Sequence, residues 1–477
     1  MSWLGFEMPL ITTSSFLCLF LVILLALIKN FQKQWWTPNR IQNRMAAQGV
    51  HGPSYKFIHG NTKEILSMKR ETMSKPRSLT HDIFSAVQPH IHAWSKIFGK
   101  NFLQWYGVQP QMIIAEPELC KEKLLGDSIS MAEGEKWVKL RKLAHLAFHG
   151  ESLKSMIPEM IKSSETMVQR WKTYEGKEIE VNEEFRFFTS EVISRTAFGS
   201  SFLEGRDIFE MLRELTSLIF RNTFKLRLPG ISMFYKTSDE IKSEKLEKGI
   251  HDIITEIVRK REKTAMTGEA DGFGSDYLGI LLKAHHDANE KQRISVDDLV
   301  DECKTFYFAG RETTNSLLAW TVFLLALHTD WQEDARKKVL ELFGNDETPG
   351  SDGLNKLKTE VRLGQVVVPA NVELHVTNLA LHHEPKYWGK DVQLFKPERF
   401  SEGVAKATNN NAVAFMPFGM GPRTCVGMNF AVIGAKIALS MILQRYSFTL
   451  SPGYVHSPIQ FLTVRPQHGV QVILHPV

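Results

Sequence analysis

Cys425 is the residue whose surroundings most clearly indicate chemistry. It lies in the segment 415–430, FMPFGMGPRTCVGMNF. Five residues of this segment form a spaced pattern: Phe418, Gly421, Arg423, Cys425 and Gly427. Glycines permit a tight loop whose backbone amides turn toward one sulfur, and the helix expected from Gly427 onward favours a thiolate at its N-terminus. Arg423 supplies positive charge for an anionic group, and Gly427 leaves space for a flat ring. An isolated cysteine is usually a small buried hydrophobe, but this pattern predicts a thiolate facing a bound group.

A second polar group, Ala309-Gly-Arg-Glu-Thr-Thr314, interrupts an apolar stretch of helical pattern. Gly310 costs about 1 kcal/mol relative to alanine inside a helix, so something must offset it. One interpretation is a helix that opens around a ligand, with Ala309 and Thr313 on one face and Glu312 relaying protons. The other is a close helix crossing at Gly310, with Thr313 bonding back to the carbonyl one turn earlier. The sequence alone leaves both interpretations open.

The helix that carries this group is expected to be long and central. Ser295 and Asp298 form a capping-box start, and the apolar pattern continues to about Leu327. Such a helix is roughly 48 Å long at 1.5 Å per residue, enough to cross a whole domain. Its second half, LLAWTVFLLAL, is apolar all round, which is typical of a helix buried on every side.

The N-terminus resembles a membrane anchor. Residues 8–28 carry no charge, and Lys29, Lys33 and Arg40 follow them. About 20 apolar residues in a helix span a bilayer core, and the positive charges place the rest of the chain in the cytosol. A cleaved signal peptide is the alternative, but the run is too long and lacks both a basic start and a small-residue cleavage site. We therefore expect an anchor over 1–30, a hinge over 31–60 and one large domain over 61–477.

Composition supports this organisation and excludes some functions. The 477 residues are 43% hydrophobic with a net charge of +5, and the basic residues are dispersed. This argues against nucleic acid and fits membrane lipid or an acidic protein partner. The four cysteines form no CxxC pair, which argues against a zinc ribbon or a disulfide framework. The periodicity of the apolar residues predicts a mainly α fold with a small β component. Helical periodicity occurs over 137–150, 155–175, 183–198, 207–222 and 238–263, and strand patterns occur only at 111–115, 364–368, 372–376 and 470–475.

Taken together, the ordered motifs resemble those of the cytochromes P450, the haem-thiolate monooxygenases. The loop around Cys425 is similar to their haem-ligating signature, and the 309–314 group to their oxygen-activating threonine motif. Trp137-Val-Lys-Leu-Arg141 matches the WxxxR element, and 397–400, PERF, matches the element upstream of the cysteine loop. Strings such as WWTPNRIQ, TAFGSSF and HHEPKYWGKD resemble plant enzymes of the clan that contains secologanin synthase.

The resemblance implies a fold, a cofactor and a reaction. Haem b would lie between the long central helix and the cysteine loop, with Cys425 as the thiolate ligand of the iron. Thr313 and Glu312 would supply protons during oxygen activation. The remaining residues implied to contact the haem or its pocket are Trp137, Arg141 and Arg423 at the propionates, with Ala309, Phe418 and Gly427. The enzyme would insert one oxygen atom of O2 into a hydrophobic terpenoid or hormone-like metabolite. Electrons would come from an NADPH–cytochrome P450 reductase at the endoplasmic reticulum membrane, with the catalytic domain in the cytosol.

Two gaps separate the chain from the family pattern. Relatives carry a helix with Glu-x-x-Arg before PERF, but here 354–359 runs directly into 360–364, and a second shortening lies near 123. Arg399 loses its family partners and is expected to use water, Glu398 or Glu360 instead; removing one side of such a network costs about 3–5 kcal/mol. The alternative function is therefore a catalytically impaired or inactive truncated form with weak or no haem binding. A third, weaker alternative is an unrelated anchored helical protein in which Cys425 is merely buried.

Overall fold

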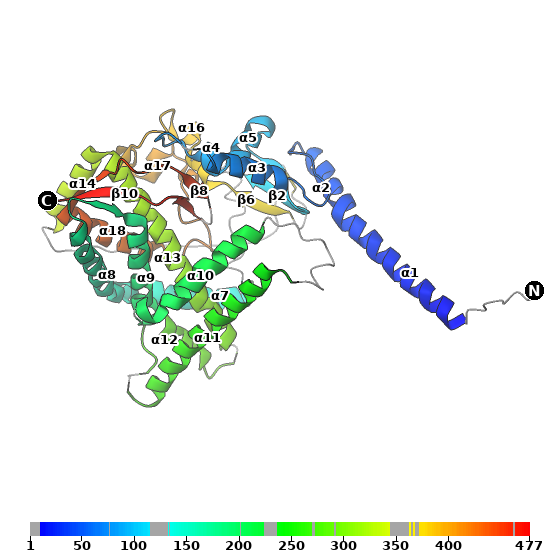
Figure 1. The fold of residues 1–477 in the computed structure, drawn as a ribbon, viewed down its shortest axis with the longest axis horizontal. Coiled ribbons are helices and arrows are strands. Elements are labelled where there is room, and N and C mark those ends of the chain that lie inside the picture. Colours follow the sequence, from blue (N-terminus) through cyan, green and yellow to red (C-terminus); the bar gives the residue numbers. More distant parts are fainter. Residues whose placement is uncertain are drawn as a thin grey trace, which may run out of the picture.

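The computed structural model shows a helical body from which one N-terminal helix projects (Figure 1). It describes residues 10–75, 77–114, 132, 134–200, 202–223, 236–269, 272–290, 292–343, 362–363, 366–367, 372–460 and 463–477. The segments with the two expected gaps, near 123 and at 359/360, lie outside these residues. The described elements confirm a mainly α fold with a small β component.

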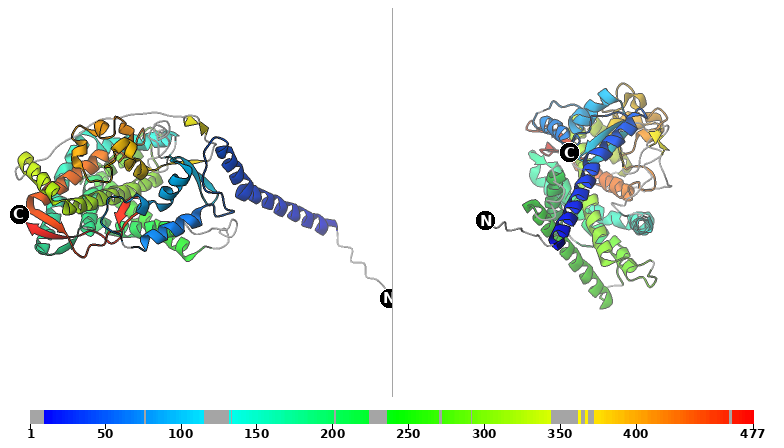
Figure 2. Two further views of the ribbon diagram at one scale, coloured as in Figure 1. Left: turned by 90° about the horizontal axis from the view of Figure 1, so that it is seen from above. Right: turned by 90° about the vertical axis from the view of Figure 1, so that its right-hand side faces the viewer.

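The projecting arm is continuous helix from α1 (Leu10–Phe31) through the π-helical turn η1 (Gln32–Trp36) to α2 (Thr37–Ala46). Figure 2 shows α1 pointing away from the body, and its described apolar side chains are exposed. By length and composition this helix can cross a membrane. The hinge expected from residue 31 is helical up to Ala46 instead. The reason is that α2 is docked: Met45 is fully buried, and the Tyr55 hydroxyl donates to the Gln34 carbonyl at 2.6 Å.

A small sheet holds the arm to the body. Strands β1 (Phe102–Tyr106) and β2 (Gln109–Ile114) are antiparallel, and β6 (Glu373–Val376) pairs in parallel with β2. Met45 packs into a cluster with Leu103, Trp105 and Met112 of this sheet. Thus the predicted strands 111–115 and 372–376, far apart in sequence, are neighbours. The helices beside this sheet are α3 (Thr62–Met73), α4 (Phe84–Val87) and α5 (Pro89–Phe98).

The helical body contains the main core. Its elements are α7 (Gly134–Phe148), α8 (Gly150–Trp171), α9 (Val181–Phe198), α10 (Phe202–Thr223), α11 (Ser238–Met266), α12 (Tyr277–His285), α13 (Val296–Leu327), α14 (Thr329–Phe343) and α18 (Met428–Arg445). One large cluster of buried apolar side chains joins them. Each of the five helices expected between residues 137 and 263 is present, because their apolar faces at 3.6-residue spacing pack against this core.

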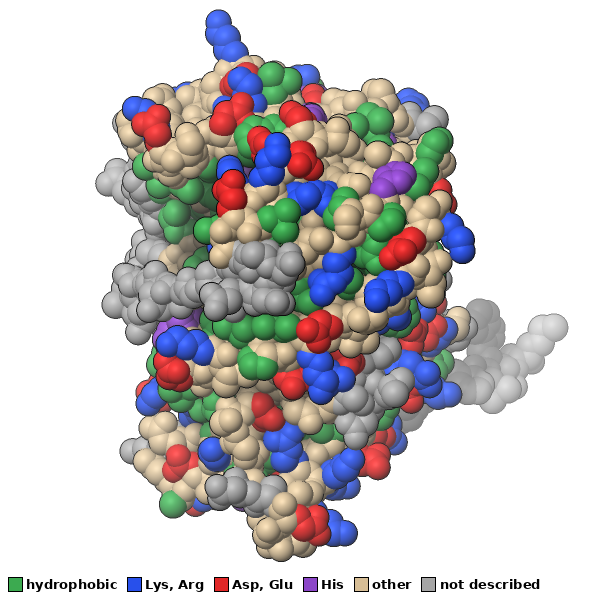
Figure 3. Space-filling view, turned by 90° about the vertical axis from the view of Figure 1, so that its left-hand side faces the viewer, with side chains coloured by type: hydrophobic (Ala, Val, Ile, Leu, Met, Phe, Trp, Pro, Cys, Tyr) green, Lys and Arg blue, Asp and Glu red, His purple; other side chains and the backbone are tan. Residues whose placement is uncertain are grey.

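The remaining elements are short. The strands are β3 (Glu178–Glu180), β4 (Arg362–Leu363), β5 (Val366–Val367), β7 (Tyr446–Leu450), β8 (Pro458–Gln460), β9 (Val464–Pro466) and β10 (Gln471–Pro476); the helices are η2 (Lys172–Tyr174), α15 (Asn378–His382), α16 (Pro385–Trp388), η4 (Pro397–Phe400), α17 (Val404–Ala407) and η5 (Ala412–Ala414). Strand β10 pairs with both β3 and β7, and β8 pairs with β9. On the face turned away from α1, Lys and Arg alternate with Asp and Glu (Figure 3), which agrees with the dispersed charge of the sequence.

Helix α13 crosses the body as predicted. Ser295 caps it and exchanges hydrogen bonds with Asp298, and the helix ends at Leu327. The helix is unbroken at Gly310, so the predicted opening of the backbone is not seen. Instead, a Cβ on Gly310 would lie 2.8 Å from Cδ1 of Ile193, a buried residue of α9. The glycine is therefore explained by the close crossing of α9 and α13.

Gly310→Val should destabilise the protein although valine favours helix more than glycine does. The added methyl groups collide with Ile193 in a packed interior, and such overpacking costs typically about 2 kcal/mol. Urea unfolding followed by circular dichroism measures the effect. The double variant with Ile193→Ala should lose less stability than the sum of the losses of the two single variants, because the smaller side chain leaves space for the valine. Strictly additive costs would contradict the proposed contact.

Candidate functional site

Three helices carry the residues singled out by the motifs, and an aromatic cluster holds them together. Phe148 of α7 stacks on Phe306 of α13, with ring centroids 5.0 Å apart. The same ring meets Phe430 of α18 edge-on at 5.4 Å. Phe306 lies one turn before Gly310 on α13, and Phe430 lies in the first turn of α18, which follows the Cys425 loop. The cluster therefore fixes the spacing between the central helix, the WxxxR helix and the cysteine loop.

The cysteine loop is closed by its own backbone. The Cys425 amide donates to the Phe418 carbonyl at 2.9 Å, and the Thr424 amide donates to the Gly421 carbonyl at 3.0 Å. Gly419 and Gly421 have φ of 74° and 84°, in the left-handed region that favours glycine. Helix α18 follows, with Gly427 at its N-cap. The sulfur thus lies just before a helix N-terminus, as the sequence predicted.

The electrostatics at the sulfur combine opposing effects. The Cys425 side chain is accessible, yet the surrounding protein is dense enough that burial raises the pKa of its thiol. The Gly427 amide and the charge of Arg141 act in the opposite direction and lower that pKa. In the protein alone burial outweighs both, so the expected thiolate needs more positive charge than the chain provides. A bound metal ion supplies such charge and deprotonates a coordinating thiol.

Trp137, Arg141 and Arg423 converge beside the cysteine. The Arg423 guanidinium lies over the Trp137 ring at 4.5 Å, and its Nη2 donates to the Ala132 carbonyl at 3.0 Å. Arg141 interacts electrostatically with both Arg423 and Cys425. Helix α7 is held in place from the other side, since Lys136 pairs with Asp298 and Lys139 donates to the Arg293 carbonyl at the start of α13.

This cluster fits the propionate end of a haem. Burial lowers the pKa of Arg141, and among the described residues no carboxylate pairs with its guanidinium. Nε1 of Trp137 is buried and has no hydrogen-bond partner within the described part of the chain. A Cβ at Gly427 would touch only the Cys425 sulfur, at 4.0 Å, so the space beside the sulfur is open. Two guanidinium groups and an orphaned donor next to a thiol are complementary to a cofactor that carries carboxylates and a metal.

The central helix presents one open face. Ala309, Thr313 and Leu317 are exposed although α13 is otherwise largely buried. Thr313 Oγ1 donates to the Ala309 carbonyl at 2.8 Å. The packing interpretation predicted this bond. The three exposed residues are spaced four apart, however, so the Thr313 hydroxyl lies on an exposed face of the helix. Packing therefore explains Gly310, while Ala309 and Thr313 stay available to a ligand.

Glu312 does not share that face. Its carboxylate lies 3.6 Å from Nε of Arg311, and it lines a cavity of about 400 Å³ between α9, α10, α13 and strand β9 with the turn that follows it. Its charge also acts on Arg465 of β9. The structure thus brings Ala309 and Thr313 together, and it directs Glu312 toward a separate group of arginines.

Two residues that hold the cysteine loop were missed by the sequence analysis. The Met416 amide donates to Nε2 of His382 at 3.1 Å, and Asn378 donates to the Met416 carbonyl at 3.2 Å. Both side chains come from α15. The string around His382 was noticed only as a family resemblance, because nothing in its spacing indicates which backbone group it would meet.

Acid should loosen this attachment. Burial, with a smaller effect of His383, lowers the pKa of His382 to about 4, so the folded protein keeps the ring neutral. Between pH 6.5 and about 4 the unfolded chain takes up a proton there that the folded chain does not, and stability falls as the pH falls. His382→Gln keeps an acceptor that does not titrate, so urea midpoints measured across this range should fall less steeply for that variant. Equal slopes would contradict the role of His382.

Arg399 of the PERF element has found a partner that was not predicted. Its Nη1 bonds to Asp391 Oδ1 at 3.1 Å, and its Nη2 donates to the Asp391 carbonyl at 3.0 Å. Nη1 also donates to the Trp388 carbonyl. Among the described residues, Asp391 and not Glu398 provides this pairing, and Glu360 lies outside them. The arginine is therefore satisfied within its own neighbourhood.

Comparison with known proteins gives consistent matches over nearly the whole chain. A family model described as Cytochrome P450 matches residues 102–359 and 355–474. "Cytochrome P450 CYP749A22" of Panax ginseng is 54% identical over 97% of this chain and 96% of its own length. "Cytochrome P450 CYP72A219" of the same plant is 38% identical, covering 98% and 99% respectively. The "7-deoxyloganic acid hydroxylase" of Catharanthus roseus is 37% identical, covering 92% and 94%.

Proposed function

The chain belongs to the cytochrome P450 family of haem-dependent monooxygenases, and on that premise we propose that it oxidises a hydrophobic terpenoid or hormone-like plant metabolite. The observation that carries the proposal is the convergence of Cys425, Arg141, Arg423 and Trp137 at one place. The family implies haem b as cofactor and electrons from NADPH through a reductase. The named relative from Catharanthus, a hydroxylase of a plant acid, supports a substrate of plant secondary metabolism.

The roles of the individual residues follow from their positions. Cys425 would bind the iron through Sγ, and haem supplies the oxygen-activating redox chemistry when bound. Arg141, Arg423 and Trp137 would hold the propionates by charge and hydrogen bonds, and Phe418 and Gly427 would shape the loop under the ring. Thr313 can exchange its hydroxyl bond to Ala309 for one to a reacting oxygen and so hold a proton there. Glu312 would supply protons from the neighbouring cavity.

We further propose a single-pass location in the endoplasmic reticulum membrane with the body in the cytosol. The exposed apolar arm supports an anchor, and Lys29, Lys33 and Arg40 lie on the body side of α1. NADPH–cytochrome P450 reductase in the same membrane would be the electron donor. The substrate, being hydrophobic, would reach the body from the lipid.

A second candidate function is an impaired form of the enzyme. We propose that segments near 123 and 359/360 are missing relative to the family. The overlap of the two matched segments at 355–359 supports the second gap, as does the ginseng alignment, which runs over 507 positions for a chain of 477 residues. In that form the anchor and the body would remain, with weak or no haem binding.

The carbon monoxide difference spectrum of the reduced full-length chain separates the two. The enzyme predicts the red-shifted absorption of a thiolate-bound haem, followed by product formation when the reductase and NADPH are added. An absent band, or one typical of histidine ligation, would favour the impaired form. A matched variant with the ginseng segment inserted between Thr359 and Glu360 should then regain the thiolate band; if it does not, the gap is not the cause.

A further inference from the structure

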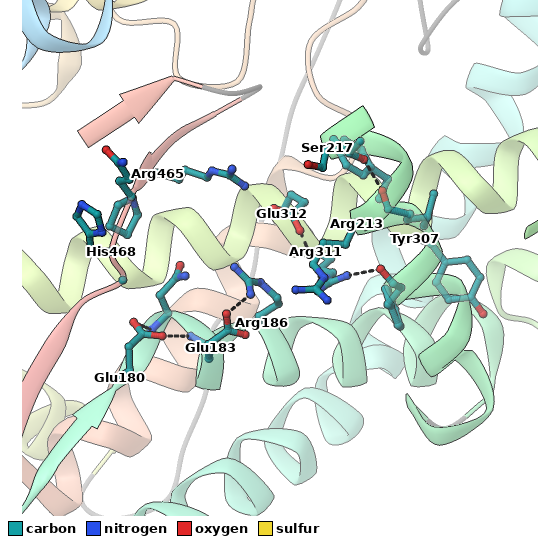
Figure 4. Close-up of a pocket in the computed structure, with 18 residues that line it drawn as sticks. Glu180, Glu183, Arg186, Arg213, Ser217, Tyr307, Arg311, Glu312, Arg465 and His468 are labelled. Atoms are coloured by element: carbon teal, nitrogen blue, oxygen red, sulfur yellow. Dashed lines mark hydrogen bonds and ion pairs between the residues drawn. The ribbon is translucent and has the colours of Figure 1, made fainter. Parts of the chain in front are cut away.

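The cavity lined by Glu312 has an unusual distribution of charge. Figure 4 shows Arg186 of α9, Arg311 of α13 and Arg465 of β9 gathered around Glu312. Other charges in the lining are already engaged. Glu180 accepts the amides of Asn182, Glu183 and Val470, the Glu183 carboxylate pairs with Arg186, and Arg213 pairs with Glu210. Glu312 is therefore the carboxylate that faces both Arg311 and Arg465.

Arg311 is fixed in this position but not satisfied. It is 5% exposed, its Nη1 donates to the Phe209 carbonyl at 3.0 Å, and its guanidinium lies 5.2 Å from the Phe209 ring centre. Its Nε is buried and has no hydrogen-bond partner in the described part of the chain, and the same holds for Nε of Arg186. The Glu312 carboxylate lies 3.6 Å from Nε of Arg311, which makes an ion pair but is beyond hydrogen-bond distance. A buried guanidinium that is held by one end and keeps such a donor is preorganised to bind an anion.

The positive groups also act on one another. Burial lowers the pKa of Arg465, Glu312 raises it, and Arg186 lowers it again. Burial likewise lowers the pKa of Arg311, with opposing effects of Glu312 and Arg186. Glu210 and Glu183 also raise the pKa of Arg311. Because guanidinium groups stay charged in proteins, a further negative charge in the cavity would stabilise these groups in the same way.

Apolar side chains also line the cavity. They are Phe209 and Leu212 of α10 and Phe308 of α13, with the Phe209 ring beside the Arg311 guanidinium. Phe308 and Glu312 of the cavity lining directly precede Ala309 and Thr313, which lie on the open face of α13. The cavity therefore runs along the helix beside the face where oxidation is expected. The volume of about 400 Å³ is in the range of small-molecule sites.

We propose that this cavity binds the carboxylate of an otherwise apolar molecule, with the carboxylate between Arg311 and Arg465 and the carbon skeleton against Phe209, Leu212 and Phe308. This inference specifies a hydrophobic acid as the substrate. The oxidation of that acid rests on the proposed function, whereas its binding in the cavity does not.

Calorimetric titration of the purified full chain in detergent micelles tests the binding. The probes are dehydroabietic acid, a diterpenoid carboxylate, and its methyl ester, which has the same skeleton without the charge. The acid should bind about tenfold more tightly, as a charge-assisted bond to a buried arginine implies. Arg465→Gln should remove this preference and leave the ester unchanged, while Arg213→Gln, which alters an exposed pair in the same lining, should not.

A variant that is expected to bind the acid more tightly keeps the test independent of folding defects, which would weaken binding. Glu312→Gln removes the carboxylate that competes with the ligand, so the acid should bind several-fold more tightly. Equal affinity for acid and ester, a preference that survives Arg465→Gln, or weaker binding of the acid to Glu312→Gln would each overturn the proposal. So would inorganic phosphate binding that depends on Arg465 without any preference for the acid. The carbon monoxide spectrum is recorded on the same samples: a missing thiolate band contradicts the proposed oxidation but not the acid site.

Discussion

Cys425→Ser is expected to abolish the thiolate absorption of the reduced, carbon monoxide-bound protein and to reduce product formation to background. A serine hydroxyl does not ionise at neutral pH, even with the Gly427 amide and Arg141 beside it, and it cannot replace a thiolate as iron ligand. The arginines and Trp137 remain, so we expect residual haem association through its propionates, with altered ligation. The measurement is the difference spectrum, with haem content determined in parallel.

The matched control is Cys303→Ala. Cys303 lies on α13 and is fully buried, and burial raises the pKa of its thiol well above the usual range. It therefore stays a neutral packing residue, and its replacement should leave the thiolate band in place. A band that survives Cys425→Ser, or that is lost only with Cys303, would show that the assignment of the ligand is wrong.

Arg399→Ala is expected to cost about 3 kcal/mol of folding stability, a large fraction of what a domain has. The arginine is 15% exposed and donates to two backbone carbonyls, those of Trp388 and Asp391. Its loss removes the donor to the Trp388 carbonyl and one of two donors to the Asp391 carbonyl, which keeps the Leu394 amide. Chemical denaturation of the full chain measures the change. Haem retention at elevated temperature provides a second measurement, since the PERF element leads into the cysteine loop.

Asp391→Asn removes the ion pair with Arg399 but keeps the hydrogen bonds of Arg399 to the two backbone carbonyls. Lys396, followed by Arg399, lowers the pKa of Asp391 to about 2, so the carboxylate stays charged down to strongly acidic pH. The carboxylate is exposed, however, and exposed ion pairs contribute little. We therefore expect a much smaller loss than for Arg399→Ala. Equal losses would mean that the ion pair, and not the carbonyl contacts, stabilises this segment.

The elements that sequence predicted best were those with a repeating physical pattern. The capping box at Ser295 and the apolar run to Leu327 gave both ends of α13, and the glycine positions gave the closed loop before α18. Contacts between distant segments could not be predicted in this way. No pattern indicates that Ile193 meets Gly310, that His382 receives the Met416 amide, or that Asp391 pairs with Arg399.

Glu312 illustrates the same limit within the site. Adjacent residues of a helix point about 100° apart, so a motif that places Glu312 next to Thr313 does not place their side chains together. Which direction becomes the ligand face depends on what packs around α13. Here α9, α10 and β9 surround Glu312 with arginines, while Thr313 faces open space.

The stiff join between α1 and the body constrains how the protein can sit at a bilayer. A flexible linker would let the body rotate freely relative to α1. Here the helix continues to Ala46, and Met45 packs against the side chains of strands β1 and β2. The tilt of the span then sets which side of the body rests on the lipid headgroups. In the proposed membrane-anchored state, the angle between α1 and the body would therefore fix where a hydrophobic compound could pass from the membrane into the protein.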